Sequence, residues 1–321
     1  MEAFATALNS HAADPSLVET GAMNFTKTIH KKPYPAILPS RPELSQNGRT
    51  VVITGGSAGI GFAIAQGFAQ AGAKRIIILG RRQNLVDEAV SKLEREYQGV
   101  QFSGIQSDVN DLGHSEKLWK GFEEDGTVID VLVLNAAKIS SDGPILALGR
   151  DDVWDSFTMN VRSLLDFSER FYKQKNGEGR QKASFAMISW QFLVNLSTEA
   201  IHDFRKAGPW PAYSASKNAG TLLIQLIAKD TSPENMQIIN FHPGVVKTSL
   251  FQDVPDDFYP FDDAALAGSF AVWAASEEAR FLHGRFVWAK WDVEELKTGE
   301  IGDKIRKNDL YLKVGVVGLQ G

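Results

Sequence analysis

A tyrosine and a lysine four positions apart, in Tyr213-Ser-Ala-Ser-Lys217, have the types and spacing for acid–base chemistry. Apolar spacing around them predicts a helix over about 212–229, and residues at i and i+4 of a helix share one face. A free tyrosine has a pKa of about 10, and a neighbouring ammonium favours the phenolate and lowers that pKa. The pair therefore predicts a proton-transfer centre, although an ordinary surface pair explains these two residues better when they are taken alone.

A second candidate site is the glycine-rich stretch 51–61, Val-Val-Ile-Thr-Gly-Gly-Ser-Ala-Gly-Ile-Gly. A short β-branched run stops at Gly55 and helical apolar spacing begins at Ile60, which predicts a buried strand that turns directly into a helix. Glycine permits positive φ and close approach of a ligand, and a helix N-terminus offers N–H groups to an anion. We therefore expect a diphosphate-binding turn, with a ligand-free glycine turn as the alternative. Its residues are Gly55, Ser57, Gly59, Ile60 and Gly61.

Strand and helix patterns alternate along most of the chain. Further strands are predicted over 75–79, 100–104, 131–134, 237–241 and 286–288, and long helices over about 153–173 and 212–229. Right-handed crossovers place helices on both faces of a parallel sheet, so we predict an α/β fold with a single Rossmann-type, doubly wound parallel sheet in one domain, residues 48–321. Residues 1–47 are proline-rich toward their end and form an arm that is extended over this domain or partly disordered. Residues 297–321 carry no clear assignment.

Polar residues stand where the predicted strands end. The carboxyl ends of parallel strands lie at one edge of the sheet, which is where such sheets bind ligands. We therefore expect one site to collect these residues, which include Thr54, Arg81, Asp108, Asn135 and Thr248.

The order and separation of six motifs resemble the short-chain dehydrogenase/reductase family, in its compact Thr-Gly-x-x-x-Gly-x-Gly branch. The motifs are the glycine turn, Asp108-Val109, Asn135-Ala136-Ala137, Asn160, the Tyr213/Lys217 pair and Pro243-Gly244 with Thr248. The resemblance covers about 48–291 and is nearest to fungal members with a similar arm and a Gly-Arg-Phe-Val…Trp-Asp ending. Leu134 and Ala137 replace an asparagine and a glycine of the family's fourth-strand motif, and neither change removes an acid–base group.

The resemblance implies a role for each matching residue. Tyr213 is expected to donate a proton to a carbonyl, or to accept one in the reverse direction, while Lys217 lowers its pKa and holds the nicotinamide ribose. Asn160 is expected to bind a water that links Lys217 to solvent. Asp108 is expected at the adenine, Asn135 along the cofactor groove, and Val246 and Thr248 at the carboxamide.

The family also places a substrate-orienting hydroxyl at the end of the fifth strand, where this chain offers two candidates. The stretch Val-Asn-Leu-Ser-Thr, residues 194–198, fits the family's Asn-x-Ser-Ser pattern and makes Thr198 the acting hydroxyl with Ser197 beside it. Ser189 is the other candidate, but a tryptophan follows it and it lies farther from Tyr213. We prefer Thr198, which leaves 183–191 as an extra segment without a physical account. Bonding to local backbone is the alternative for either hydroxyl.

Cofactor choice follows from charge after the second strand. Dinucleotide domains that prefer NAD usually have an acidic residue there for the ribose 2′-hydroxyl. This chain has Gly80 in that place, followed by Arg81 and Arg82. Guanidinium groups suit a phosphate, so the sequence favours NADP(H) over NAD(H), with two solvated charges at a helix start as the alternative.

Residues 246–279 are expected to cover the substrate side as a lid. An aromatic-lined pocket suits a bulky, largely apolar small molecule, and the acidic residues of this segment argue mildly against an anionic one. The same aromatic residues could equally belong to the core. They are Phe251, Phe258, Tyr259 and Phe261, with Trp210 approaching from before the tyrosine helix.

Composition excludes several classes of site and partner. The chain has no cysteine, and its six histidines lack metal-site spacing, so no metal site is expected. A net charge of −5 gives no reason to expect nucleic acid or an anionic membrane as a partner. The sequence lacks an apolar run of membrane-spanning length and a secretion signal, which makes the cytosol the simplest compartment. The family resemblance implies a homodimer or homotetramer that pairs through the helices over 153–173 and 212–229.

The combined prediction is an NADP(H)-dependent oxidoreductase. It would interconvert a ketone and a secondary alcohol on a medium-sized, largely apolar substrate, in specialised metabolism. The alternative is a nonredox protein on the same scaffold, either a nucleotide or metabolite sensor or an isomerase or cyclase. A sugar-nucleotide epimerase is disfavoured, because it would need a further substrate domain.

Overall fold

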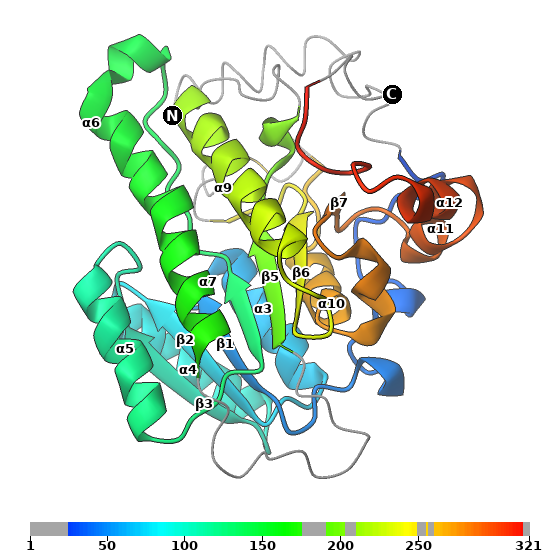
Figure 1. Cartoon of the computed structure of the whole chain (residues 1–321). Coiled ribbons are helices and arrows are strands. Elements are labelled where there is room, and N and C mark those ends of the chain that lie inside the picture. The colour runs from blue at the N-terminus through cyan, green and yellow to red at the C-terminus, as the bar shows by residue number, and fades with distance from the viewer. Residues whose placement is uncertain (1–24, 175–190, 203–209, 249–254, 256–259, 317–321) are drawn as a thin grey trace.

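The computed structural model describes residues 25–174, 191–202, 210–248, 255 and 260–316. The strands in these ranges are β1 (Thr50–Thr54), β2 (Arg75–Gly80), β3 (Gln101–Gln106), β4 (Val131–Leu134), β5 (Gln191–Leu196), β6 (Met236–His242) and β7 (Phe286–Trp288). They form a seven-stranded sheet in the order β3-β2-β1-β4-β5-β6-β7, and each neighbouring pair is parallel (Figure 1). The predicted fold class is therefore confirmed.

Helices cover both faces of the sheet. They are α3 (Gly59–Gln70), α4 (Gln83–Glu96), α5 (Leu112–Glu124), α6 (Ile145–Phe157), α7 (Ser163–Lys173), α9 (Pro211–Lys229), α10 (Ala264–Ala274), α11 (Val293–Lys297) and α12 (Gly299–Lys307). Successive residues of β1 face opposite ways, so Val51 packs in a core with α3, α4 and α10, and Val52 in a core with α5, α7 and α9. Burial on both faces explains why the strands are continuous apolar runs.

The α10 helix is a core element and not part of a lid. Every residue from Leu266 to Ala274 is buried, and α10 crosses α3 so closely that a Cβ on Gly67 would lie 2.8 Å from the carbonyl oxygen of Gly268. A helix that is apolar all round belongs in an interior. The predicted lid over 246–279 is therefore wrong for 264–274.

The helix predicted over 153–173 begins earlier and changes its winding. The described chain is helical from Ile145, with a nonhelical Gly149 at φ +81°, and a π-helical turn, η3 (Thr158–Arg162), joins α6 to α7. Single π turns inside helices often occur at functional sites. Asn160 lies in this turn.

The described part of the N-terminal arm packs against the end of the chain. Phe25 stacks on Trp291 with ring centroids 4.6 Å apart, and the Tyr34 hydroxyl donates to the Trp291 carbonyl at 2.9 Å. Two short 3₁₀ turns follow, η1 (Pro35–Ile37) and η2 (Pro42–Leu44), and bury Ile37 and Leu44. Of the two alternatives for the arm, residues 25–47 follow the one in which it lies over the domain.

Candidate functional site

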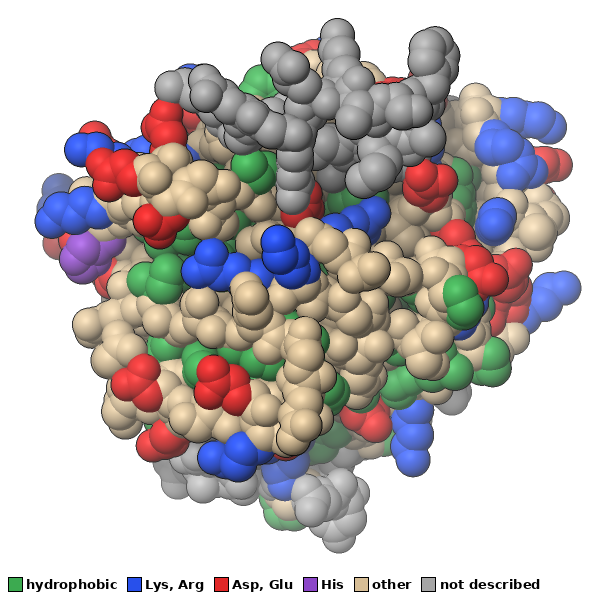
Figure 2. Space-filling model, turned by 90° about the horizontal axis from the view of Figure 1, so that it is seen from below, with side chains coloured by type: hydrophobic (Ala, Val, Ile, Leu, Met, Phe, Trp, Pro, Cys, Tyr) green, Lys and Arg blue, Asp and Glu red, His purple; other side chains and the backbone are tan. Residues whose placement is uncertain are grey.

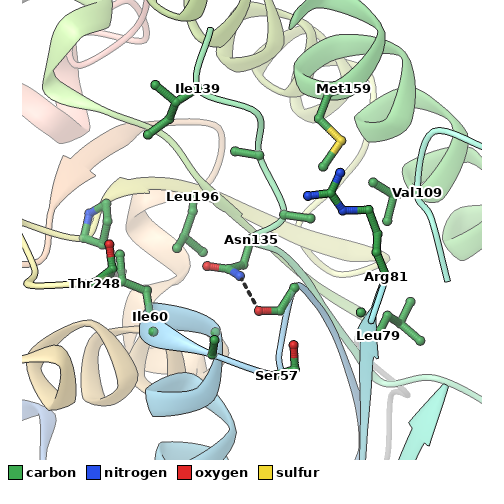
Figure 3. Close-up of a pocket in the computed structure, with 18 of the residues that line it drawn as sticks. Ser57, Ile60, Leu79, Arg81, Val109, Asn135, Ile139, Met159, Leu196 and Thr248 are labelled. Atoms are coloured by element: carbon green, nitrogen blue, oxygen red, sulfur yellow. Dashed lines mark hydrogen bonds between the residues drawn. The ribbon is translucent and has the colours of Figure 1, made fainter. Parts of the chain in front are cut away.

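A pocket of about 360 Å³ opens where the strands end. Residues that directly follow β1, β2, β3, β4, β5 and β6 all contribute to its lining (Figure 3). The structure brings together most of the predicted site residues in it: Gly55, Ser57, Gly59, Ile60, Gly61, Arg81, Arg82, Asn135, Ser197, Tyr213, Lys217 and Thr248.

The turn after β1 is built on glycine backbone. Gly59 has φ +54°, and a Cβ on Gly61 would lie 2.6 Å from the amide nitrogen of Asn135. That amide donates to the carbonyls of Thr54 at 2.9 Å and Gly55 at 3.1 Å, and Figure 3 draws one of these two bonds as a dashed line from Asn135. The two bonds fix the turn from the neighbouring strand end. Because no side chain caps α3, its first N–H groups remain available to an anion beside the pocket.

The end of β2 supplies positive charge and open space. Arg81 and Arg82 are exposed at the rim of the pocket. A Cβ on Gly80 would lie 3.0 Å from the Ser57 hydroxyl, so glycine keeps this corner free for a ligand. One buried hydroxyl here, that of Ser107, lines the pocket and has no hydrogen-bond partner. Such a group invites a polar ligand.

Tyr213 and Lys217 both line the pocket from the first turns of α9, which begins with Pro211. Lys217 is buried, and its Nζ donates to the carbonyl of Leu196 at 2.5 Å. Burial raises the pKa of Tyr213 to about 12, opposed by a hydrogen bond with the Thr198 side chain. Burial also lowers the pKa of Lys217 to about 8. The predicted lowering of the Tyr213 pKa is therefore wrong for the chain by itself, because desolvation of the phenol dominates.

The two hydroxyls after β5 have different partners. Ser197 is buried, and its Oγ lies 2.6 Å from Oγ1 of Thr221 on α9. Thr198 is hydrogen-bonded to the Tyr213 side chain but is not part of the pocket lining. The strand ends at Leu196, so both hydroxyls directly follow a strand end. The competing candidate, Ser189, and residues 183–190 of the extra segment lie outside the described residues.

Asn160 is buried behind the pocket. Its Oδ1 accepts from the backbone N–H of Lys138 at 3.0 Å, and its Nδ2 donates to the Lys138 carbonyl and the Ser216 hydroxyl, each at 2.9 Å. The side chain thus ties the loop after β4 to α9, next to the catalytic pair predicted from sequence. A role in holding water stays a prediction.

Two predicted cofactor residues lie beside the pocket and not in its lining. Asp108 accepts from the backbone N–H of Asn110 at 2.9 Å, while its neighbours Ser107 and Val109 line the pocket. Val246 is buried and pairs with Asp262 in an isolated bridge. Of the predicted substrate aromatics, Phe251, Phe258 and Tyr259 lie outside the described residues, and Trp210 and Phe261 are half-buried outside the lining.

Sequence reasoning missed several lining residues. Val109 is part of the motif Asp108-Val109, which gave it no role, and Ser107 could have been found because it precedes Asp108 at the same strand end. Ile139 and Met159 had no such signal, since a loop and the π turn bring them to the pocket. Together with Leu196 they give one side of the pocket an apolar character (Figure 3).

The described residues give no sign of a metal site or a membrane-spanning helix. In the residues that the structure covers, no three His, Cys, Asp or Glu side chains are grouped to hold a metal ion. No helix in those ranges has the length and apolar character needed to cross a bilayer. Figure 2 shows acidic and basic side chains interspersed over one face, in keeping with the net charge of −5.

Comparisons with known proteins agree with this arrangement. A family model described as short chain dehydrogenase matches residues 49–258. The short chain dehydrogenase/reductase nsrO of Aspergillus novofumigatus is 33% identical over 301 residues, which cover 91% of this chain and 96% of that protein. Among solved structures, the NADP complex of Pseudomonas aeruginosa RhlG has a TM-score of 0.67 at 21% identity, covering 77% of this chain and 97% of that one. L-sorbose reductase of Gluconobacter frateurii has a TM-score of 0.65 at 21% identity, covering 80% and 100%.

Proposed function

The chain belongs to the short-chain dehydrogenase/reductase family, and from that premise we propose that it reduces a ketone to a secondary alcohol with NADPH, or catalyses the reverse. The observation that carries the proposal is that Tyr213 and Lys217 line the same pocket as the glycine turn and Arg81. A proton donor and a dinucleotide cradle in one pocket are what carbonyl reduction requires.

The residues present fit a dinucleotide phosphate. The uncapped start of α3 and the glycines before it suit the diphosphate. The two guanidinium groups of Arg81 and Arg82, with the Ser57 hydroxyl beside Gly80, suit a further phosphate and favour NADP(H) over NAD(H). The unpartnered Ser107 hydroxyl is a further polar group for the cofactor. RhlG and L-sorbose reductase form complexes with NADP and NADPH, respectively.

The acid–base groups support the reductive direction. With a pKa of about 12, the Tyr213 phenol carries its proton at neutral pH and can donate it to a carbonyl oxygen. Thr198 is hydrogen-bonded to Tyr213 and offers a second hydroxyl to the same oxygen. Lys217, one helical turn further on, lines the same pocket, and its Nζ donates to the Leu196 carbonyl. Bound NADPH supplies the hydride.

The substrate is a medium-sized, largely apolar small molecule. Ile139, Met159 and Leu196 line the pocket on the side away from the glycine turn, and such side chains suit an apolar ligand (Figure 3).

Self-association through α7 and α9 is part of the proposal. Leu165 and Tyr172 on α7 and Leu222 and Leu226 on α9 are exposed, and apolar patches of this kind mark protein contacts. Sedimentation of the purified protein should give a dimer or tetramer, and Leu226→Glu should shift it toward monomer. A wild-type chain that sediments as a monomer at micromolar concentration would contradict this part.

The enzymatic proposal is tested by mixing the purified protein with NADPH and a panel of bulky apolar ketones. Loss of NADPH absorbance supports it. The second candidate is a nonredox binding protein on this scaffold, which is favoured by the position of Thr198, the predicted substrate-orienting hydroxyl, outside the pocket lining. Tight NADPH binding with no turnover across the panel would favour that candidate.

A further inference from the structure

A buried carboxylate, Asp262, lies directly behind the segment that follows β6. Only 1% of its side chain is exposed. Its Oδ2 accepts from the backbone N–H of Val245 at 2.8 Å, and its own N–H donates to the carbonyl of Val245 at 2.8 Å. These two hydrogen bonds hold Val245 on both sides, and the bridge to Val246 continues the contact.

The backbone before Val245 is shaped to the carboxylate. Gly244 has φ +90°, and a Cβ there would lie 2.5 Å from Oδ2 of Asp262. Glycine is needed at this position for two reasons, its φ and the closeness of the carboxylate. The segment 244–246 therefore cannot shift without giving up its contacts with Asp262.

Lys290 is the main cation that compensates the charge of Asp262, and Lys31 adds a smaller contribution. The Nζ of Lys290 lies 3.4 Å from Oδ1, and the Lys290 side chain is itself largely buried. Burial raises the pKa of Asp262, and Lys290 acts in the opposite direction, because a buried charge is costly unless it is paired. The arm covers this pair from outside: His30 donates its N–H to the Lys290 carbonyl, and Asp263 donates its N–H to the Lys31 carbonyl, both at 2.8 Å.

We propose that Asp262 is a positioning residue that holds the segment 244–248 in place for the nicotinamide end of the cofactor, with Lys290 as its charge partner. The inference rests on the proposed function and on the prediction, implied by the family resemblance, that Val246 and Thr248 hold the carboxamide. Pro243 and Thr248, on either side of the clamped residues, both line the pocket. Thr248 also approaches α3, since a Cβ on Gly59 would lie 3.1 Å from its Cγ2. A shift of the clamped segment would thus move the pocket wall.

The test measures NADPH affinity, kcat and thermal stability for Asp262→Asn and Lys290→Met. Both variants should raise the KM and Kd for NADPH about tenfold, equivalent to about 1.4 kcal/mol, while kcat stays within about twofold. Lys290→Arg should restore the wild-type KM, because it keeps the positive charge. Asp263→Ala is the matched control: it removes the cap bond to the Ala265 N–H and should lower Tm without changing KM.

Three results decide the matter. If both variants keep the wild-type KM while the wild type turns over, Asp262 does not position the cofactor. If Asp262→Asn, Lys290→Met and Lys290→Arg all lose Tm and activity together, the role is merely structural. If the wild type neither binds nor oxidises NADPH, the proposed function fails, and this inference fails with it. Should Asp262→Asn not fold, Lys290→Met decides alone, since it leaves the carboxylate in place.

Discussion

Two turns of this molecule are each fixed by one side chain, but the two side chains differ in chemistry. The turn after β1 and the turn after β6 both follow a buried strand, and both use glycine at positive φ, Gly55 at +67° and Gly244 at +90°. A neutral amide, that of Asn135, fixes the first turn, whereas a buried carboxylate, that of Asp262, fixes the second.

The difference follows from what each turn has to receive. The first turn leads into the uncapped start of α3, which suits an anion, and a carboxylate there would repel it. Within the described residues the second turn does not lead into a helix N-terminus, and the carboxylate that fixes it is paired with Lys290. A charged acceptor makes a stronger hydrogen bond to a backbone N–H than a neutral one. The neutral amide therefore suits a turn that receives an anion, and the carboxylate suits a turn that has a lysine beside it.

The largest expected effect concerns proton donation, which depends on Tyr213 and on neither turn. Tyr213→Phe removes the proton donor and should lower kcat by about 10²- to 10⁴-fold, while the Kd for NADPH changes by less than about threefold. Turnover assays and a fluorescence titration of NADPH measure the two quantities. Tyr97→Phe is the control and should behave as wild type, because it removes a hydroxyl that is bonded to Gln70 outside the pocket. Full activity of Tyr213→Phe would remove the assigned proton donor.

The next test replaces the neutral amide that fixes the first turn by a carboxylate. Asn135→Asp removes the donor to the Thr54 and Gly55 carbonyls and adds a negative charge beside the anion site, so NADPH affinity should fall about a hundredfold. Asn47→Asp adds the same charge at an exposed position and should leave affinity unchanged. Equal Kd values for the two variants would show that the neutral clamp has no role in anion binding.

The next prediction concerns how the buried charge of Lys217, which has no carboxylate beside it among the described residues, affects the free energy of unfolding. Its pKa is lowered to about 8, so between pH 8 and 10.5 the unfolded chain binds more protons than the folded one. Stability due to Lys217 therefore rises with pH in this window. From pH 7 to 9.5 the wild type should gain about 2 kcal/mol in unfolding free energy relative to Lys217→Met. Urea unfolding at both pH values measures this, and a pH-independent difference would contradict the lowered pKa.

The smallest effect concerns cofactor preference. Replacing Arg81 and Arg82 by alanine should weaken NADPH binding about tenfold and leave NADH binding nearly unchanged, because only the former carries the extra phosphate. Arg150→Ala, at an exposed position on α6, is the control. Equal losses for the two nucleotides would mean that the arginines provide only general attraction.

Both turns could be predicted from sequence as motifs, but the carboxylate that fixes the second turn could not, for a physical reason. A β-branched run, glycines and a following amphipathic helix are local signals, and strand order then brings Asn135 to the turn. Asp262 is one of several aspartates between Asp253 and Asp263, and nothing in its neighbourhood marks it as buried. Its burial depends on Lys290, which arrives from a distant part of the chain.

The π turn and the burial of α10 also could not be predicted from the sequence. The π turn at Thr158–Arg162 adds one residue to the helix. The apolar spacing of the sequence continues across this turn and therefore does not reveal it. The burial of α10 depends on the close approach of Gly67 and Gly268, which only the assembled sheet brings together. The Tyr213 pKa was predicted in the wrong direction because spacing on a helix carries no information on desolvation.

The docking of the arm has a consequence for the order in which the protein is completed during synthesis. His30 pairs with Asp292, 262 positions later, so the arm leaves the ribosome long before its docking surface exists. Contacts of such long range form late in folding. The sheet up to β6 can assemble first, while the cover over Lys290 and Asp262 waits for the segment that contains Asp292. Chains that end before this segment would therefore leave the segment after β6, which forms part of the pocket wall, without its cover.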